Sequence, residues 1–357
     1  MTESAHLKGI YRLPSNLAQD LEKLREMTED YKAGRISSAQ YRAYRVPQGI
    51  YEQRTENTFM LRVRCPAGGV LPHHMRRLAA VSRTYGNGVL HVTTRQDIQV
   101  HLIPLDSMYP GLVDLAEAGL STKGGGGNTV RNITACYDAG ICPREEFDVA
   151  PYAVALTEFL LRDPGSYQLP RKFKIAFSGC SKDCSGASIN DVGYIAKRRN
   201  GQLGFAVYVG GGMGAYSRVA DLFEEFVPAE DIHLVAEAVK RVFDKYGNRR
   251  DKDEARLRFL IEGIGLERFR ELYEVELAAL RASQRVGLDI RPLPRAERPV
   301  PGRAETPSPG FGAWCRWNVT PQRQNGYFCV HIPLFLGDIP ADTMEKLAQV
   351  VEEHGEG

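Results

Sequence analysis

The chain has 357 residues, enough for two or three domains, and its 43% apolar and 25% charged residues are ordinary for a globular protein. A formal net charge of +2 excludes a global attraction to nucleic acid or to an anionic membrane, so any basic function must be local. The N-terminal residues carry no apolar signal-peptide core, and no apolar run approaches the ~18 residues of a membrane span, which predicts a cytoplasmic protein.

Residues 1–57 are predicted to form an N-terminal helical arm. Within them, residues 17–34 are charged and roughly helical in period, and Gly34 is a plausible end of the helix. The glycine-rich residues 121–128 are interpreted as a flexible joint that ends the next domain.

The segment between the arm and this joint predicts a ferredoxin-like half-domain over residues 58–128. TFMLRVRCPAGGV alternates like a strand, PHHMRRLAAVSRTYG reads as a helix closed by Gly86, and VLHVTTRQDIQVHLI reads as one long strand. Strand, helix and strand in this order form the core of a ferredoxin-like unit.

Residues 129–290 mix helix-like and strand-like segments in an irregular order, which predicts an α+β domain. Residues 291–310 contain six prolines and are predicted to form a linker without a core.

The tail, residues 311–357, repeats the first half-domain at an offset of 269 residues. The matching pairs are Gly68 with Gly337, Met75 with Met344, Leu78 with Leu347, Ala79 with Ala348, Val81 with Val350, Gly86 with Gly355 and Gly88 with Gly357. The repeat predicts the start of a second, pseudo-symmetric ferredoxin-like half-domain. Its first copy continues into a closing strand after Gly88, so we expect a truncated chain or one part of a split protein.

Seven cysteines, an odd number in a chain with cytosolic features, argue against a disulfide framework. Four of them form two close pairs, Cys136-x5-Cys142 and Cys180-x3-Cys184. Structural zinc sites usually use C-x2-C spacing, whereas wider spacings suit a 4Fe–4S cluster, which normally takes four cysteines. The spacing favours the cluster and leaves zinc, or plain buried cysteines, as alternatives.

Basic residues flank these cysteine pairs in the sequence: Arg62, Arg64, Arg131, Lys172 and Lys174. Residues two apart on a strand point to the same side, so each Arg or Lys pair is predicted to share one face, with Phe173 and Ile175 on the opposite, apolar face. Strand cations commonly face water, but the proximity of these to the cysteine loops favours a site.

Together these segments resemble the sirohaem-dependent sulfite and nitrite reductases. The motifs are MLRVRCPAGGV, VTTRQDIQVH, VRNI, LPRKFK, VGGGM, GNRRDKDEARLRFLIEGIGLERF and the two cysteine pairs. The resemblance covers about residues 50–290 and restarts at residue 311.

The resemblance implies a sirohaem coupled to a 4Fe–4S cluster, with Cys184 as the bridge between them. The implied cluster ligands are Cys136, Cys142, Cys180 and Cys184. The implied catalytic residues on the substrate side are Arg62, Arg131, Lys172 and Lys174, and those that hold the sirohaem are Arg64, Thr93, Arg95 and Gln99.

The implied activity is the six-electron reduction of sulfite to sulfide or of nitrite to ammonia. Arginines bind oxyanions with forked hydrogen bonds, and lysines crowded by other cations have lowered pKa values and can donate protons. The cysteines beside RKFK favour sulfite. The chain shows no flavin or nicotinamide motif, so a ferredoxin or a separate flavoprotein is the expected electron donor.

The chain departs from the single-chain members because its first half carries both the cations and the cysteines. In a pseudo-twofold assembly these sets come from opposite halves, so they need not face the same sirohaem, and a missing half or another subunit would complete a pocket. Two other functions stay open: a non-catalytic half-subunit that contributes half of a cofactor site, and a structural zinc domain.

Overall fold

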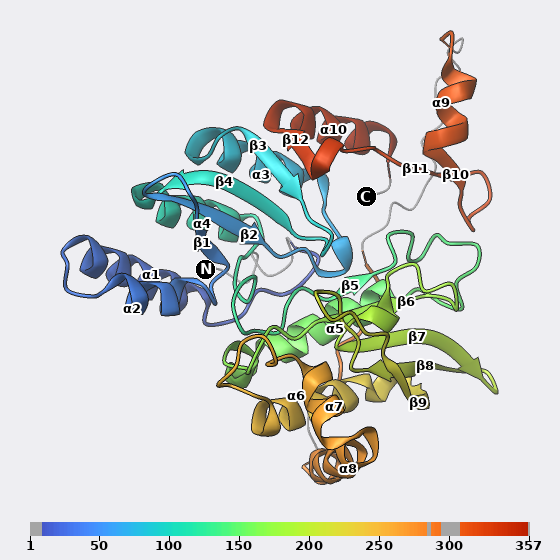
Figure 1. Cartoon of the computed structure of the whole chain (residues 1–357). Helices are drawn as coiled ribbons and strands as arrows, with labels where there is room; N and C mark the ends of the chain where they lie inside the picture. The colour runs from blue at the N-terminus through green and yellow to red at the C-terminus, as the bar shows by residue number, and fades with distance from the viewer. Residues whose placement is uncertain (1–8, 284–286, 294–307, 356–357) are drawn as a thin grey trace.

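The computed structural model describes residues 9–283, 287–293 and 308–355. The start of the predicted arm, most of the predicted linker and Gly357 therefore lie outside the described residues. Two five-stranded sheets form the body of the chain, each with helices packed against it (Figure 1). This arrangement confirms the predicted α+β fold. No helix in the described part of the chain is long and apolar enough to cross a lipid bilayer.

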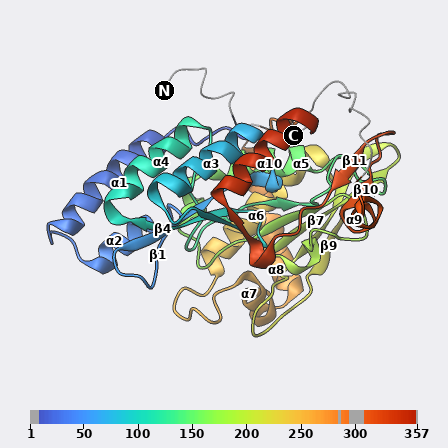
Figure 2. The same cartoon turned by 90° about the horizontal axis from the view of Figure 1, so that it is seen from above.

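The first sheet is antiparallel throughout, in the order β1–β2–β4–β3–β12. Helices α1, α4, α3 and α10 lie in a row over one face of it (Figure 2), and α2 follows α1. The bounds are α1 Leu17–Lys32, α2 Ser38–Arg45, β1 Ile50–Glu52, β2 Thr58–Val63, α3 Pro72–Tyr85, β3 Val89–Val92, β4 Ile98–Pro104, α4 Met108–Glu117, β12 Asp338–Pro340 and α10 Ala341–His354.

The predicted long strand VLHVTTRQDIQVHLI is wrong, because it folds back as a hairpin of β3 and β4. The side-chain oxygen of Thr93 accepts hydrogen bonds from the backbone N–H groups of Arg95, at 3.2 Å, and Asp97, at 3.1 Å. Gln96 takes a positive φ of 58° at the turn. A threonine hydroxyl that binds nearby backbone groups competes with strand pairing and favours a turn. The alternation of polar and apolar residues continues through this turn, so the sequence pattern does not reveal it.

The glycine-rich segment 121–128 is a packed connection rather than a flexible joint. Residues 121–126 are buried, and a Cβ on Gly126 would lie only 2.2 Å from the carbonyl oxygen of Val46. The prediction of flexibility was wrong because close packing, and not mobility, requires these glycines.

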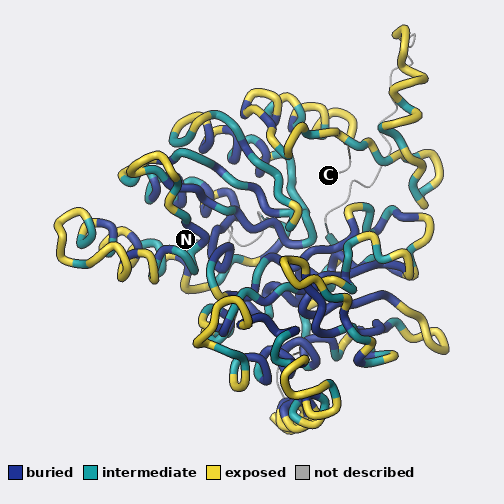
Figure 3. The backbone as a smooth tube through the Cα atoms, in the orientation of Figure 1, coloured by how far each residue is buried: buried dark blue, intermediate teal, exposed yellow. Residues whose placement is uncertain are grey.

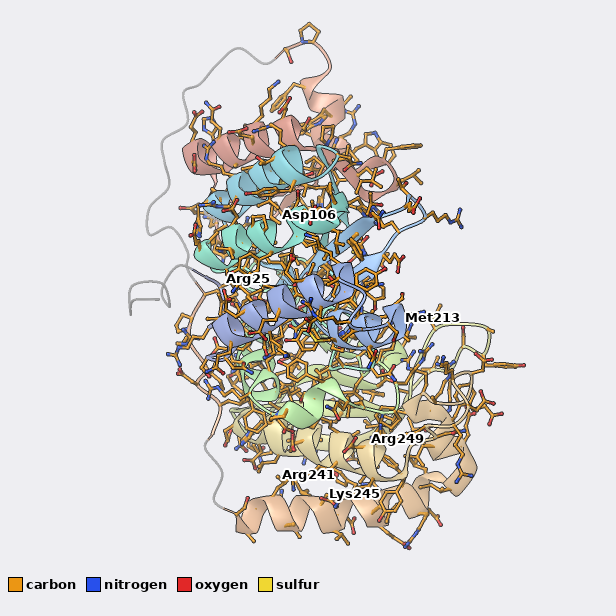
Figure 4. All side chains as sticks on the ribbon, turned by 90° about the vertical axis from the view of Figure 1, so that its left-hand side faces the viewer. Arg25, Asp106, Met213, Arg241, Lys245 and Arg249 are labelled. Carbon is orange, nitrogen blue, oxygen red and sulfur yellow. The ribbon has the colours of Figure 1, made fainter. Side chains whose placement is uncertain are left out.

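The second sheet has the order β5–β6–β7–β8–β9, with β5, β6 and β7 parallel and the rest antiparallel. Figure 4 shows Arg241 and Lys245 of α6 between α6 and α8, where both pair with Glu276 of α8. The bounds are β5 Thr134–Ala135, α5 Ala150–Leu161, β6 Ile175–Ser178, β7 Val192–Arg199, β8 Gln202–Val209, β9 Asp221–Pro228, α6 Ile232–Tyr246, α7 Leu257–Ile264 and α8 Leu266–Ala282.

The internal repeat is present in the backbone. Both ends of α10 lie 269 residues after those of α3. Ala67 and Leu336, also 269 apart, share the unusual φ values of 55° and 54°. The hairpins agree as well, because the pairing Ile50↔Leu61 recurs as Val319↔Val330.

The second copy begins with α9, Phe311–Asn318, and the hairpin of β10, Val319–Pro321, and β11, Phe328–Val330. Its α10 packs beside α3, and Arg83 forms ion pairs with Asp342 and Glu345. In contrast, α9 and the hairpin are largely exposed (Figure 3), with Trp317 at 85% of its maximal exposure.

Candidate functional site

Two neighbouring parallel strands, β5 and β6, organise the candidate site. Arg131 precedes β5 and Cys136 follows it directly, while Lys174 precedes β6 and Cys180 follows it by two residues. Parallel strands present like ends to the same edge of a sheet, so the cations gather at one edge and the cysteines at the other. The four residues of β6 alone separate these edges by about 13 Å.

The four cysteines face one place, which we call the cysteine site (Cys136, Cys142, Cys180 and Cys184). The guanidinium of Arg144 interacts electrostatically with Cys142, Cys184 and Cys180, of which Cys142 raises the pKa of Arg144 most. Cys136 is close to Cys184, and its sulfur accepts a hydrogen bond from the backbone N–H of Gly179 at 3.2 Å. Burial raises the pKa of the Cys136 thiol to about 11.

The cysteine site has the donor set of an iron–sulfur cluster. Within the described residues, no three His, Cys, Asp or Glu side chains converge tightly enough to bind one metal ion. Four cysteine thiols are the donor set of a 4Fe–4S cluster, and amide-to-sulfur hydrogen bonds such as that from Gly179 are a usual feature of such sites. Three of the cysteines are buried, whereas Cys184 is exposed.

Asp183 organises the loop between Cys180 and Cys184, and the sequence analysis missed it. Its carboxylate accepts hydrogen bonds from the Ser178 hydroxyl, the Ala187 N–H and the Ser188 hydroxyl, each at 2.6 Å, and from the Ser188 N–H at 3.0 Å. Its φ of 51° is one that aspartate tolerates better than most residues. The sequence did contain a signal for this loop: an aspartate followed by small residues, a pattern typical of a turn held by side-chain to backbone hydrogen bonds.

At the opposite edge lies the cationic cluster, which contains all four of the predicted catalytic residues. Its members are Arg62, Arg95, Arg131, Lys172, Lys174 and Arg256, as their mutual electrostatic interactions show. Arg62 and Arg131 both donate to the carbonyl oxygen of Gly125, at 3.0 Å and 2.6 Å. Arg62 also lies over the ring of Tyr51, 5.0 Å from its centre.

The two lysines of the cluster lie in a partly buried, strongly positive environment. Burial and then Arg95, Arg256 and Lys172 lower the pKa of Lys174 to about 8, with Asp191 acting in the opposite sense. Burial also lowers the pKa of Lys172. Phe173, between them, is fully buried, as the predicted alternation of faces requires.

The residues predicted to hold the cofactor mostly bind the protein itself. Arg64 is buried and donates to the carbonyls of Lys123 and Val130, at 3.1 Å and 2.9 Å, so it fixes the glycine-rich segment that Arg62 also contacts. Gln99 faces Arg62: with its amide oxygen turned toward the guanidinium, it accepts from Nε and Nη2 at 3.1 Å each. Thr93 shapes the β3–β4 turn.

Arg95 joins the two sheets. From the β3–β4 turn it donates to the carbonyls of Asn132, at 3.0 Å, and Ile175, at 2.6 Å, and to the side-chain oxygen of Asn190 at 2.6 Å. Burial lowers its pKa to about 10. Arg95 therefore holds the ferredoxin-like half-domain against the edge of β6, next to Lys174.

Two buried carboxylates near the cations were also missed. Asp191 is fully buried, pairs with Arg256 at 2.8 Å and accepts the backbone N–H of Lys174 at 2.8 Å. Asp97 is buried among Arg64, Arg131, Arg62 and Arg95, and burial raises its pKa. These contacts join residues that are distant in the sequence, so no local sequence pattern predicts them.

We expect Asp191→Asn to lower the free energy of unfolding by about 3–5 kcal/mol, because it leaves the buried Arg256 without its counter-charge. Urea denaturation followed by circular dichroism measures the change. The matched control is Asp253→Asn, at an exposed position, with an expected change within about 0.5 kcal/mol. Equal stability of the two variants would contradict a structural role for the Asp191–Arg256 pair.

Comparison with known proteins yields two family matches. Residues 126–279 match the nitrite and sulphite reductase 4Fe-4S domain, and residues 51–116 match the nitrite/sulfite reductase ferredoxin-like half domain. The two matches contain the cysteine site and the cationic cluster.

Among curated proteins, the chain is similar to an assimilatory ferredoxin-dependent nitrite reductase of Haloferax mediterranei, with 31% identity over 87% of this chain and 54% of the relative. A ferredoxin–nitrite reductase of Synechococcus elongatus is 30% identical over 85% of this chain and 57% of the relative. The chain spans about half the length of the curated relatives it matches.

Among solved structures, the Mycobacterium tuberculosis NirA protein superposes with a TM-score of 0.74 at 25% identity, covering 95% of this chain and 63% of that one. Dissimilatory sulfite reductase I shares the fold, with a TM-score of 0.55 at 15% identity over 74% of this chain and 82% of that one.

Proposed function

Since the chain belongs to the nitrite and sulphite reductase family, we propose that it takes part in the six-electron reduction of nitrite to ammonia, at a sirohaem coupled to a 4Fe–4S cluster. The observation that carries the proposal is the arrangement of β5 and β6, which end in cysteines at one edge and begin beside cations at the other. A reductase of oxyanions needs both an electron path and a positively charged, proton-donating surface.

On the electron side, the cysteine site would hold the cluster. The thiols of Cys136, Cys142 and Cys180, which are buried, would be cluster ligands screened from water, and the exposed Cys184 would be the ligand nearest the sirohaem. When bound, the coupled cofactors supply electrons one at a time to a small anion at the sirohaem iron. The Asp183 network and the Gly179 N–H hold the ligand loops in place.

On the substrate side, the cationic cluster would bind nitrite and supply protons at the sirohaem pocket that it faces, which need not be the pocket beside Cys184 because the two residue sets lie at opposite edges of β5 and β6. Arg62 is held by the Gly125 carbonyl and by Gln99, and Arg131 by the same Gly125 carbonyl, so both would present their positive charge to an oxyanion from fixed positions. Lys174, with a pKa near 8, keeps its proton at neutral pH but releases it more readily than an ordinary lysine, as a general acid must.

The relatives favour nitrite over sulfite as the substrate, and they favour a ferredoxin as the electron donor, because several of them are named ferredoxin-dependent nitrite reductases. The preference for sulfite drawn from the cysteines beside RKFK has no support among them. We therefore propose nitrite as the principal substrate, with sulfite as the alternative.

An anaerobic turnover assay tests the proposal. The cofactor-loaded protein receives reduced methyl viologen and either nitrite or sulfite, and ammonium and sulfide are measured. We expect ammonium from nitrite, with six viologens oxidised for each ammonium. Sulfide from sulfite without ammonium from nitrite would reverse the substrate assignment. Neither product from a fully loaded protein would favour the non-catalytic half-subunit.

A further inference from the structure

The hairpin of the second repeat lies on the loop that carries two of the cluster cysteines. The turn between β10 and β11 contacts the segment between Cys136 and Cys142: the backbone N–H of Arg323 donates to the carbonyl of Ile141, and the Gln324 side chain donates to the carbonyl of Gly140, both at 2.8 Å. In the first repeat the equivalent turn, Arg54–Thr55, lies on an open groove instead.

The Arg323 side chain adds an ion pair that reaches into the same loop. Its guanidinium lies 3.3 Å from the Glu145 carboxylate, which is 1% exposed. The other oxygen of Glu145 accepts the backbone N–H of Gly140 at 2.7 Å, so Glu145 closes the loop around Cys142. Arg323 thus neutralises the carboxylate that holds the ligand loop in shape.

A third contact lies beside the first cysteine of the loop. The rings of His331, just after β11, and Tyr137 meet edge to face, with centres 5.8 Å apart. Tyr137 is next to Cys136 in the chain and within electrostatic reach of Cys184 and Cys329. The hairpin therefore contacts the loop near both of its cysteines.

We propose that the β10–β11 hairpin is a latch that holds the Cys136–Cys142 loop in its ligand conformation and shields the cluster, with Arg323 and Gln324 as its positioning residues. The inference rests on the proposed function, because it presumes a cluster at the cysteine site. The side chains of the hairpin are largely exposed, so burial of apolar surface contributes little to its stability. Its contacts with the Cys136–Cys142 loop therefore contribute much of what holds it in place. Opening it would expose the loop around Cys142 to solvent and to chelators.

The latch is tested by the rate at which the anaerobically purified holoprotein loses its cluster absorbance in EDTA with ferricyanide. We expect the double variant Arg323→Ala, Gln324→Ala to lose the cluster about tenfold faster than wild type or more, since it removes the ion pair and a hydrogen bond that oppose opening. Arg323→Lys, which keeps the charge beside Glu145, is expected to restore most of the protection. Arg316→Ala, at an exposed arginine of α9, is the matched control and is expected to behave as wild type.

Loss rates in the double variant equal to those of wild type would overturn the latch. If the double variant is purified without a cluster but Arg323→Lys contains one, the latch is supported, because the contacts that only the double variant loses then decide assembly. If neither variant contains a cluster, or if Arg316→Ala loses its cluster equally fast, the specific role of these contacts is overturned. A wild-type protein without any cluster would instead refute the proposed function itself.

Discussion

Cys180→Ser is expected to abolish the cluster, leaving turnover of nitrite below about 1% of wild type, because a buried ligand of an essential redox group is lost. Cys184→Ser is expected to be equally inactive for a different reason, since this exposed cysteine is the proposed bridge to the sirohaem. Iron, labile sulfide and the visible spectrum of each anaerobically purified variant measure the outcome.

The matched control for both variants is Cys315→Ser, at a partly exposed cysteine of α9 outside the cysteine site. It should retain its iron, its colour and its turnover. If Cys180→Ser kept wild-type iron and absorbance, the four-cysteine cluster would be refuted, whatever its activity.

Lys174→Met is expected to cut nitrite turnover by about 10²- to 10⁴-fold while the sirohaem content stays intact. The substitution replaces a proton donor with a side chain of similar shape and size that cannot donate a proton. In the wild type, turnover should fall as the pH rises through about 8, where Lys174 loses its proton, and the variant should lack this limb of the profile. Lys197→Met, at an exposed lysine of β7, is the control and should match wild type at every pH.

The same substitution should stabilise the cofactor-free chain. The pKa of Lys174 is lower in the folded state than its ordinary value of 10.5, so the protonated lysine costs stability below pH 8, and the cost is relieved between about pH 8 and 10.5. At pH 7, Lys174→Met should therefore raise the free energy of unfolding by on the order of 2 kcal/mol.

A variant that keeps wild-type turnover would show that the cationic cluster does not face the working sirohaem, and a variant that loses sirohaem would make Lys174 a cofactor ligand.

The repeat was predictable from the sequence because it depends on local backbone requirements. Gly68 and Gly337 both need a positive φ, 75° and 83°, and a Cβ on Gly337 would lie 2.6 Å from the carbonyl oxygen of Val92. Small buried residues such as Ala79 and Ala348 mark the faces where α3 and α10 pack. Such constraints require the same residue types at equivalent positions of both copies, so the repeat can be recognised in the sequence at a constant offset of 269 residues.

The cysteines, Arg131, Lys172 and Lys174 could be singled out from the sequence because they lie within a few residues of β5 or β6, and their roles as ligands and catalysts stay predictions. What escaped prediction was how they are held. The Asp191–Arg256 pair joins residues 65 positions apart, and the Arg323–Glu145 pair joins two domains, so neither leaves a local pattern. The β3–β4 turn was missed although its contacts are local. Thr93 and its neighbours show the same alternation of polar and apolar residues as the two strands, so the pattern looks like one continuous strand.

Because the two residue sets lie at opposite edges, the cysteine pair Cys180 and Cys184 and the lysine pair Lys172 and Lys174 form two sites and not one, although they are close in the chain. Lys172 and Lys174 interact electrostatically with other cations and with Asp191, whereas the cysteines interact with Arg144 and Asp138. They are two separate surfaces on one pair of strands, one with the positive charge that an anion needs and one with the thiols that the proposed cluster needs.

We propose that this chain holds a 4Fe–4S cluster at its four paired cysteines and a sirohaem beside it. The most direct measurement is the metal and cofactor content of the protein purified without oxygen, with iron and zinc by mass spectrometry, labile sulfide by colorimetry and sirohaem from the visible spectrum. We expect about five iron atoms, four labile sulfides and one sirohaem per chain, without stoichiometric zinc. A colourless protein that contains one zinc per chain would contradict it.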